Sequence, residues 1–386
     1  MKNAIFKTLV VAFLLNFGAC AENKGNKAEV NQEKQDMNRM FIGTYTKPEG
    51  HVNGQADGIY VVYQDPKSGN LEKGKTVAEV INPSFVKASK DGEFLFAVSE
   101  LGSGDAESGF VYSFKINDDN TLQELSKLST ESFAPAHIEI DKTGNYVFVS
   151  NYMGGVVMVY KKNEDGALEK VQRVDLENPT ESHAHSVTIS TDNKHAYIAD
   201  LGNDKIWNFD FDPESGKLTP APQPSVDLEN GAGPRHFTLS KRGNFAYSMN
   251  ELNSTVTVFK VLPNGGLEKV QTISSLPEDF SGENSAADIH LHPSGEFLYA
   301  SNRGHNSIAA YKVDEETGTL SNLSFTSTKG KTPRNFAISP NGDFLYVANQ
   351  DSNNIAVFEI DEKSGNIQIQ GKPLEAMTPV SIEFVE

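Results

Sequence analysis

Four side chains in the second half of the chain, His185, Arg235, Glu251 and Arg303, have the types needed to hold an anion and to move a proton. Arg235 is the second residue, and Glu251 the second from last, of the stretch PRHFTLSKRGNFAYSMNEL, which otherwise alternates like an ordinary β-hairpin. A guanidinium grips carboxylate or phosphate oxygens bidentately, and an imidazole or carboxylate can accept a proton. A solvated hairpin needs no such charges at its ends, so the surrounding elements must explain their placement.

These elements repeat along the chain with a period of about fifty residues. The string SKRGNFAYSMNE at Ser240 resembles five others, and the turn residues of the six copies are Gly92, Gly144, Asn193, Gly243, Gly295 and Gly342. Successive turns are 52, 49, 50, 52 and 47 residues apart. A second turn, of the type SGNLEK or DGALEK, occurs seven times. Units of this length with four short alternating strands predict an all-β fold, a seven-bladed β-propeller with four-stranded blades.

One of the seven units is divided between the two ends of the folded region. The segment MFIGTY at Met40 matches a second strand but lacks the strand that should precede it, and TPVSIEFVE at the C-terminus supplies that strand. We therefore expect residues 40–386 to form one propeller domain whose ring is closed by N- and C-terminal strands sharing a blade. Alternation such as that of Phe94, Phe96 and Val98 predicts packing of blade on blade, and Trp207 is assigned to the same packing.

The first strand of each blade is expected to line a central channel and to pair with the second strand in a hairpin. We number positions in each copy from its turn residue, with negative numbers before the turn and positive numbers after it. Position −8, in the inner strand, then lies beside positions +7 and +8, in the second strand, at one mouth of the channel. Position +7 is nearly uniform, with Asn in four copies and Ser99 and Asp200 in the other two, which indicates a turn or backbone cap. Positions −8, −7 and +8 differ between blades, as expected of a site added to a symmetric scaffold. The mouth positions hold three of the six arginines, and the inner strands four of the nine histidines: Arg235, Arg303, Arg334, His137, His185, His236 and His290.

These residues also allow structural interpretations. Arg235, Glu251 and Arg303 could form a buried ion-pair network between blades, and His137, His236 or His290 could be hydrogen-bonded core histidines. The pair His183 and His185 could suggest a metal, but no carboxylate at fitting spacing accompanies it. We therefore expect no metal and no cofactor.

The first 39 residues differ in composition from the rest. Lys2 and Lys7 precede a short apolar run and then Cys20, the only cysteine, a pattern typical of an export signal. Residues 1–19 are predicted to be a lipoprotein signal peptide, and residues 20–39 a lipidated Cys20 followed by a disordered polar tether. The alternative is a soluble secreted protein cut near Ala19. We expect an exported, membrane-anchored lipoprotein facing the periplasm or cell surface, with membrane contact only through the lipid.

The charge of the chain excludes one class of partner. With 34 basic and 52 acidic residues, the formal net charge is −18, and no basic run is present. Nonspecific attraction to nucleic acid needs the opposite sign. We expect a monomer with a small-molecule substrate and no nucleic-acid partner.

From Met40 to Glu386 the chain resembles the lactonase-type seven-bladed propellers, typified by the propeller form of bacterial 6-phosphogluconolactonase and related to the fungal carboxy-muconate cyclases. The resemblance is carried by GAGPRH with YSMNELNSTVTVF, then AADIHLHPSGEFLYASNR, and by AHS and TPRNF. It implies a metal-independent site at the channel mouth with His185, Arg235, Glu251 and Arg303 as catalytic residues. A signal, a tether and two loops, TKPEGHVNGQADG and LGSGDAESG, are extra relative to the family's cytoplasmic enzymes.

The resemblance implies hydrolysis of a sugar lactone, 6-phosphogluconolactone or a related aldonolactone, to the aldonic acid. Such a reaction needs an activated water and a positive group facing the oxyanion. His185 or Glu251 would be the base, and Arg235 and Arg303 would polarise the carbonyl. Substrate binding is assigned to His137, His236, His290 and Arg334. The alternatives are a muconate-type cyclase that forms or opens a lactone, and a non-catalytic propeller that binds an anionic sugar or a protein.

Overall fold

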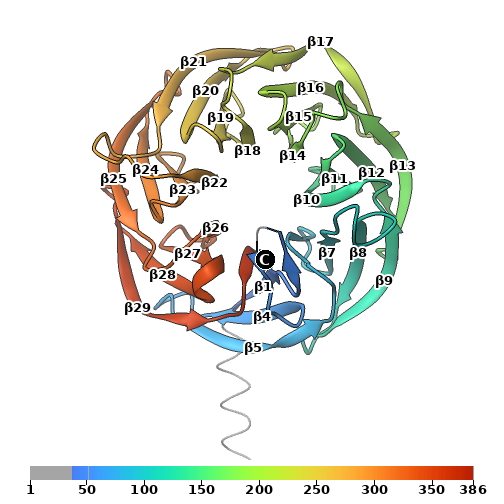
Figure 1. Ribbon diagram of the computed structural model, residues 1–386, viewed down its shortest axis with the longest axis horizontal. Helices are drawn as coiled ribbons and strands as arrows, with labels where there is room; N and C mark the ends of the chain where they lie inside the picture. The colour runs from blue at the N-terminus through green and yellow to red at the C-terminus, as the bar shows by residue number, and fades with distance from the viewer. Residues whose placement is uncertain (1–36, 51, 386) are drawn as a thin grey trace, which may run out of the picture. The chain divides into compact units, whose positions relative to one another are not determined.

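The computed structural model describes residues 37–50 and 52–385, which form seven four-stranded antiparallel sheets arranged as blades around a central channel (Figure 1). The predicted seven-bladed propeller is confirmed. In six blades the four strands follow one another in chain order from the channel outward. No helix within the described residues has the length and apolar character needed to cross a membrane.

The strands occupy equivalent places in every blade. The innermost are β6 (Val86–Ala88), β10 (Phe133–Ile140), β14 (Ala184–Ile189), β18 (Pro234–Leu239), β22 (Ser285–Leu291), β26 (Pro333–Ile338) and β30 (Pro379–Val385). The second are β7 (Phe94–Ser99), β11 (Tyr146–Met153), β15 (His195–Asp200), β19 (Phe245–Asn250), β23 (Phe297–Arg303), β27 (Phe344–Asn349) and β1 (Asn38–Thr44). The third are β8 (Phe110–Ile116), β12 (Val156–Lys162), β16 (Lys205–Asp212), β20 (Thr255–Val261), β24 (Ser307–Val313), β28 (Asn354–Ile360) and β4 (Ile59–Gln64). The outermost are β9 (Leu122–Ser129), β13 (Leu168–Asp175), β17 (Lys217–Asp227), β21 (Leu267–Ser274), β25 (Leu320–Ser327), β29 (Ile367–Glu375) and β5 (Leu71–Ala78).

Two short elements lie outside the blades. The strands β2 (Pro48–Glu49) and β3 (Val52–Asn53) form a small hairpin between β1 and β4. A 3₁₀ helix, Gln350–Ser352, follows β27. Both strands lie within TKPEGHVNGQADG, one of the two loops that the resemblance predicted to be extra.

The ring is closed where the two ends of the folded region meet. As predicted, β30 supplies the inner strand for β1, with register from Arg39 opposite Val385 to Thr44 opposite Pro379. β1 begins at Asn38, two residues before the predicted domain boundary, because the side-chain amide of Asn38 donates to Gln64 Oε1 at 2.7 Å. The predicted signal peptide, Cys20 and most of the tether lie outside the described residues.

The channel has two ends that differ in what surrounds them. We call the end at which the inner strands begin the upper end. The repeated turns that connect inner to second strands lie at the opposite, lower end. In such a turn, Phe245 N–H donates to Ser240 Oγ at 3.0 Å and Gly243 has a φ of +72°. Asn193 replaces the glycine in the third copy with a φ of +61°, a region that Asn tolerates better than most residues. Both chain ends, near Arg39 and Val385, are at the lower end.

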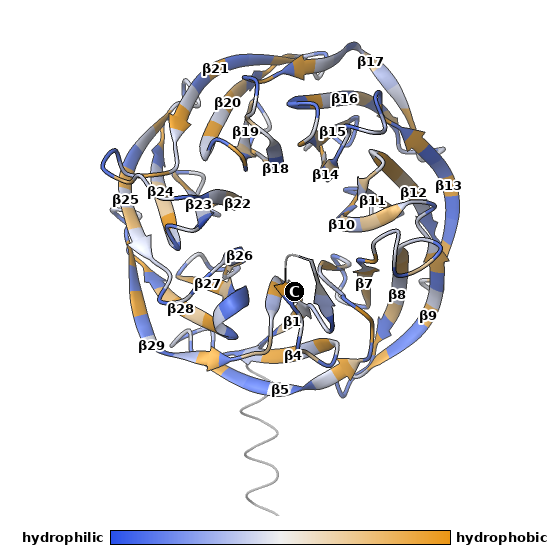
Figure 2. Ribbon diagram, viewed as in Figure 1, coloured by the Kyte–Doolittle hydropathy of each residue, from blue (hydrophilic) through white to orange (hydrophobic). Residues whose placement is uncertain are grey.

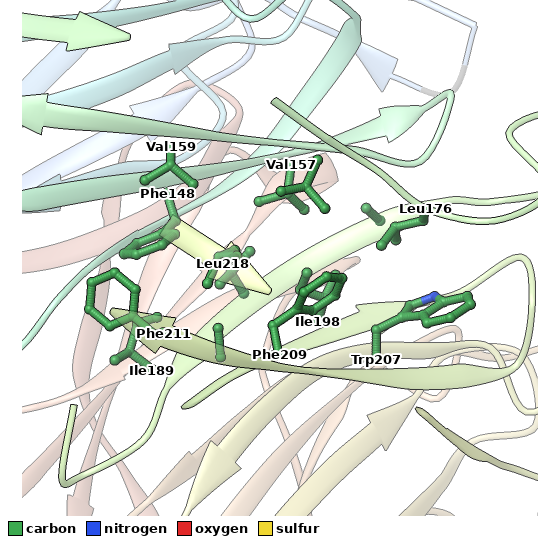
Figure 3. Packing of buried hydrophobic residues seen from close by; sticks show 14 of the residues in the cluster. Phe148, Val157, Val159, Leu176, Ile189, Ile198, Trp207, Phe209, Phe211 and Leu218 are labelled. Atoms are coloured by element: carbon green, nitrogen blue, oxygen red, sulfur yellow. The ribbon is translucent and has the colours of Figure 1, made fainter. Parts of the chain in front are cut away.

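The apolar core lies between blades. Figure 3 shows Phe148 and Val159 of one blade against Phe211 and Leu218 of the next, and Figure 2 shows apolar segments alternating with polar ones along the strands. Phe94, Phe96 and Val98 are buried against the blade of β10–β13, which confirms that prediction. Trp207 is in the cluster of Figure 3, as predicted, and its indole Nε1 donates to Asp200 Oδ2 at 3.0 Å.

Buried tyrosines on the second strands tie each blade to its neighbour. The hydroxyls of Tyr197, Tyr299 and Tyr346 donate to the carbonyls of Gly265, Gly365 and Gly69 at 3.0, 2.8 and 3.1 Å. Each glycine sits in the outer turn of the adjacent blade, so these bonds recur around the ring. The scaffold below the channel mouth is therefore held by packing and by hydrogen bonds between neighbouring blades.

Candidate active site

A β-bulge near the start of most inner strands leaves residues at the upper end of the channel without a partner in the ladder, one each in β10, β14, β18, β26 and β30 and two in β22. In β18 the register shifts between Pro234 and His236, so Arg235 has no partner in the ladder. The same shift leaves His185 unpaired in β14 and Arg334 unpaired in β26. A bulge interrupts the alternation of a strand and re-aims the side chain of its extra residue. Position −8, which varies between blades, is thus the position that the backbone presents to the mouth.

The loop before Arg235 needs its glycines. Gly231 and Gly233 have φ values of +81° and +62°, and their N–H groups donate to the two carboxylate oxygens of Asp204, both at 2.7 Å. A Cβ on Gly233 would lie 2.5 Å from the side chain of Leu252. The sequence GAGPR therefore fixes the point at which Arg235 enters its strand.

Glu251 joins two arginines that come from adjacent blades. Its Oε2 lies 3.1 Å from Nε of Arg235 and 2.9 Å from Nη2 of Arg303. The Arg235 contact has the distance of an ion pair without the alignment of a hydrogen bond. Ser285 donates its hydroxyl to Glu251 Oε1 at 3.0 Å and accepts from Arg303 Nη2 at 2.9 Å. The predicted convergence of Arg235, Glu251 and Arg303 is thus present, and it also links blades as the structural interpretation expected.

The charges in this cluster fix its protonation states. Burial acts to raise the pKa of Glu251, but Arg303, Arg235 and Arg334 outweigh it and hold that pKa below its usual value. Burial, Arg303 and Arg334 lower the pKa of Arg235 to about 9, so the guanidinium stays cationic at neutral pH. A carboxylate held between guanidiniums is a poor proton acceptor.

A third arginine reaches the mouth from the blade next to the closing blade. Arg334 Nη2 donates to the hydroxyl of Tyr45 at 3.1 Å, and that hydroxyl donates to Glu100 Oε2 at 2.9 Å. Burial works against the charge of Arg334, but Tyr45, Glu100 and Glu251 outweigh it and raise its pKa. Arg334 is therefore a permanent cation in the mouth.

These side chains surround a pocket of about 500 Å³ at the upper end of the channel. Its charged and aromatic lining consists of Glu100, Tyr152, His183, His185, Glu251, Arg303 and Arg334. Arg235 lies in a narrow space below it, which shares Glu100 and Arg334 with the pocket. A pocket of this volume accommodates a small sugar-sized ligand.

His185 differs from the other histidines of the inner strands because its ring has no hydrogen-bond partner. It is 4 % exposed, and Nδ1 is buried without a partner. Its ring packs edge-on to Tyr152 and His236, with centroids 5.7 and 5.3 Å away. Burial, followed by the charge of Arg235, holds the pKa of His185 well below its usual value. A buried histidine retained for structure is normally hydrogen-bonded, so this ring is a neutral imidazole available to a ligand.

Three further imidazoles that were assigned to substrate binding lie outside this pocket. His137 and His236 line the middle of the channel, in a cavity of about 440 Å³, where their rings are 5.5 Å apart. His236 also borders the narrow space beside Arg235. His290 also lines the cavity of about 440 Å³ and borders a second one in the lower part of the channel, three residues along β22 from Ala287 in the bulge. Strands rise about 3.3 Å per residue, which places His290 roughly 10 Å too deep for the pocket.

His183 has a structural environment. Its ring stacks on Tyr152 with centroids 4.3 Å apart, and its Nδ1 lies 2.9 Å from the carbonyl oxygen of Tyr152. Within residues 37–50 and 52–385, no group of three or more His, Cys, Asp and Glu side chains could hold a metal ion.

The uniform position +7 acts as a cap. Asn349 Nδ2 donates to the carbonyl of Thr328 at 3.1 Å, and Asn302 Nδ2 to that of Ser275. Asp200 accepts from Ser182 and from the backbone of His183. The interpretation of this position as a backbone cap is confirmed at five of the six copies, whereas the side chain of Asn250 bonds instead to the side chains of Ser248, Thr255 and Thr257.

Sequence reasoning missed several residues of the mouth. Glu100 and Tyr152 occupy position +8 of their blades, like Glu251, so comparison of blades contained the signal. Tyr45 follows β1 in the divided blade. This unit has no inner strand and no turn before β1 in the sequence, so its positions could not be numbered from a turn residue. Asp288, at position −7, is discussed below. Ser285 lies outside the compared positions.

With this geometry established, the relatives are informative. The family described as "Lactonase, 7-bladed beta-propeller" matches residues 39–384. This chain belongs to that family. A 6-phosphogluconolactonase of Formosa agariphila is 34 % identical over 312 residues, which cover 77 % of this chain and 85 % of the relative. A 6-phosphogluconolactonase of Bacillus subtilis is 29 % identical over 305 residues, 77 % of this chain and 83 % of the relative.

Solved lactonase structures have the same ring. A periplasmic gluconolactonase of Pseudomonas aeruginosa superposes with a TM-score of 0.84 at 33 % identity, over 91 % of this chain and 99 % of the neighbour. A putative 6-phosphogluconolactonase of Bacteroides fragilis gives a TM-score of 0.82 at 32 % identity, over 92 % and 99 %. The similarity therefore covers the whole propeller of this lactonase-family chain.

Proposed function

We propose that the chain hydrolyses a sugar lactone in the pocket at the upper end of the channel. One observation carries the proposal: a buried, neutral His185 without a hydrogen-bond partner lines the same pocket as Arg303, Arg334 and Glu251. Relatives named for lactonase activity support the reaction class.

His185 is the proposed base that activates water. Glu251 is the weaker candidate because two guanidiniums hold its carboxylate and lower its pKa. The depressed pKa of His185 means that the imidazole is unprotonated over the whole neutral range, although a low pKa also makes it a weak base. In this mechanism Glu251 orients Arg235 and Arg303.

The arginines are proposed to stabilise the oxyanion that forms when water attacks the lactone carbonyl. Arg303 lines the pocket, while Arg235 lies below it and shares Glu251 with Arg303. Donors that are fixed in place before reaction stabilise developing charge without reorganising. Arg334, the third cation of the mouth, is proposed to hold hydroxyl or carboxylate oxygens of the sugar.

The preferred substrate is proposed to be an aldonolactone without phosphate. Three guanidiniums in the mouth face two carboxylates, Glu251 and Glu100, so little positive charge is left for a phosphate dianion. The neighbour from Pseudomonas aeruginosa is described as a periplasmic gluconolactonase. Export of this chain and lipidation of Cys20 remain predictions, which the mass of the mature protein with and without Cys20→Ala would test.

Acid release from glucono-δ-lactone and from 6-phosphoglucono-δ-lactone, corrected for spontaneous hydrolysis, tests this proposal. We expect the full chain to accelerate the first more than the second, and His185→Gln and Arg303→Lys to lower kcat on the order of 100-fold or more. Matched controls are His195→Gln and Arg242→Lys, which lie away from the pocket and should keep kcat. Acceleration of neither lactone would overturn the proposed function, and faster turnover of the phosphorylated lactone would overturn the substrate preference.

A further inference from the structure

Asp288 is a buried acceptor that joins the inner strands of three blades. It is 1 % exposed, and its carboxylate accepts from three side chains and two backbone N–H groups: His236, His290, Asn335, Ile289 and Phe336. A backbone N–H can only donate, so the carboxylate serves as an acceptor throughout. Burial acts against its charge, but His290 and His236 outweigh it and keep the pKa of Asp288 well below its usual value.

The contacts of His236 specify its tautomer. Nε2 of His236 lies 3.0 Å from Nη1 of Arg235, and a guanidinium can only donate, so Nε2 must be the unprotonated nitrogen. The proton therefore sits on Nδ1, which lies 2.6 Å from Asp288 Oδ1 and donates to it. Burial and the charge of Arg235 lower the pKa of His236 to about 4, in agreement with a neutral ring.

Arg235 is held from two sides by this arrangement. On one side, Nη1 donates to His236 Nε2 and, at 2.8 Å, to the carbonyl of Ala287. On the other side, Nε faces Glu251. Because Arg235 sits in a bulge, the strand ladder itself does not fix its side chain, and these contacts must do so.

We infer that Asp288 and His236 are positioning residues, which hold Arg235 toward the reacting carbonyl through the chain Asp288 Oδ1, His236 Nδ1–H, His236 Nε2 and Arg235 Nη1–H. The inference rests on the proposed lactone hydrolysis for its kinetic consequence only. Asp288 orients the imidazole. Among the described residues, the imidazole is the side chain that accepts a hydrogen bond from Arg235 on the channel side.

Substitutions at His236 separate positioning from packing. His236→Leu removes the acceptor for Arg235, so the guanidinium should move from its position. A displacement of a catalytic group by about 1 Å can cost on the order of 100-fold, and we expect kcat to fall by that factor with a smaller change in KM. His236→Gln keeps an oxygen that can accept from Arg235 and an N–H that can donate to Asp288, so we expect it to restore kcat to within about tenfold of wild type, since displacements well below 1 Å cost less.

The matched control is His292→Leu. His236 and His292 are both 7 % exposed, and both rings are hydrogen-bonded on the two nitrogens, but His292 lies in a lower-end turn, with Ser294 and Gly342 as partners. His292→Leu should lower the Tm without changing kcat. Equal kcat losses in His236→Leu and His292→Leu, or no rescue by His236→Gln, would overturn the inference.

A measurement independent of activity separates this inference from the proposed function. Nitrogen-15 NMR of the full chain labelled at histidine, with His236→Gln to assign the resonance, should show His236 neutral with the proton on Nδ1 at pH 7. In Asp288→Asn we expect the Nδ1 resonance to shift, because a neutral amide oxygen replaces the carboxylate as the acceptor, while Arg235 keeps Nε2 unprotonated. A proton on Nε2 in the wild type would overturn the inference whatever the lactone assays show.

Discussion

At the scale of single residues, the site depends on side chains that are buried in unusual states. His185 is a neutral imidazole without a partner, Glu251 is a carboxylate held by two guanidiniums, and Arg235 is a 3 % exposed cation. Each state is costly in isolation and is stabilised only by its neighbours. Perturbed groups gathered in one pocket are more typical of a functional site than of a structural ion-pair network.

The depressed pKa of His185 predicts an unusual pH profile. The base must be unprotonated, and its folded-state pKa lies well below 6.5, so kcat/KM should stay level from pH 8 to about 6 and fall only under more acidic conditions. Initial rates with glucono-δ-lactone, corrected for the spontaneous reaction at each pH, provide the measurement. A half-maximal rate at the usual histidine value near 6.5 would contradict the assignment of His185.

At the scale of elements, hairpin geometry made much of the site predictable. Pairing of inner and second strands places position −8 beside position +8, so the sequence alone predicts that Arg235 lies close to Glu251. The bulges could not be predicted, because they depend on the hydrogen-bond register within a finished sheet. Depth along a strand was not predicted: the sequence placed His290 on an inner strand, where it is found, without indicating how far from the mouth it lies. The contact between Tyr45 and Arg334 could not be predicted either, because the two residues are 289 positions apart in the sequence and meet only when the ring is closed.

The tyrosines between blades give a prediction about these elements. Tyr299→Phe removes one hydroxyl donor to Gly365 while it keeps the ring in place, and should reduce the free energy of unfolding by about 1 kcal/mol. Tyr247→Phe is the matched control, because the hydroxyl of Tyr247 is buried without a hydrogen-bond partner. Loss of the Tyr247 hydroxyl should leave the free energy of unfolding unchanged or increase it. Denaturant unfolding of both variants measures the difference, and equal effects would show that the bond to Gly365 contributes nothing.

At the scale of the whole molecule, the ring holds together through its last strand. β30 gives β1 its inner neighbour, and it also reaches the adjacent blade: Ser381 Oγ and Glu383 Oε1 accept from the backbone of Val86 and Ala88 in β6. β6 is only three residues long, so these side chains replace part of a strand contact. The turn repeats predicted this closure because one unit lacked its first strand.

Removal of residues 379–386 should therefore abolish cooperative folding. The deletion leaves β1 as an exposed edge and uncovers the apolar face that packs on Val380 and Ile382. We expect loss of the sharp thermal transition and aggregation on size-exclusion chromatography. A synthetic peptide of residues 377–386 should restore part of the transition. A truncated chain that still melts cooperatively and remains monomeric would show that six complete blades suffice.

The position of the two chain ends has a practical consequence. Arg39 and Val385 pair at the lower end of the channel, while Arg303, Arg334 and His185 surround the upper end. A surface or a fusion partner that is attached directly to the ring at Arg39 or Val385 would therefore lie on the face opposite the proposed site. Such an attachment would leave the pocket open to a substrate in the surrounding solution.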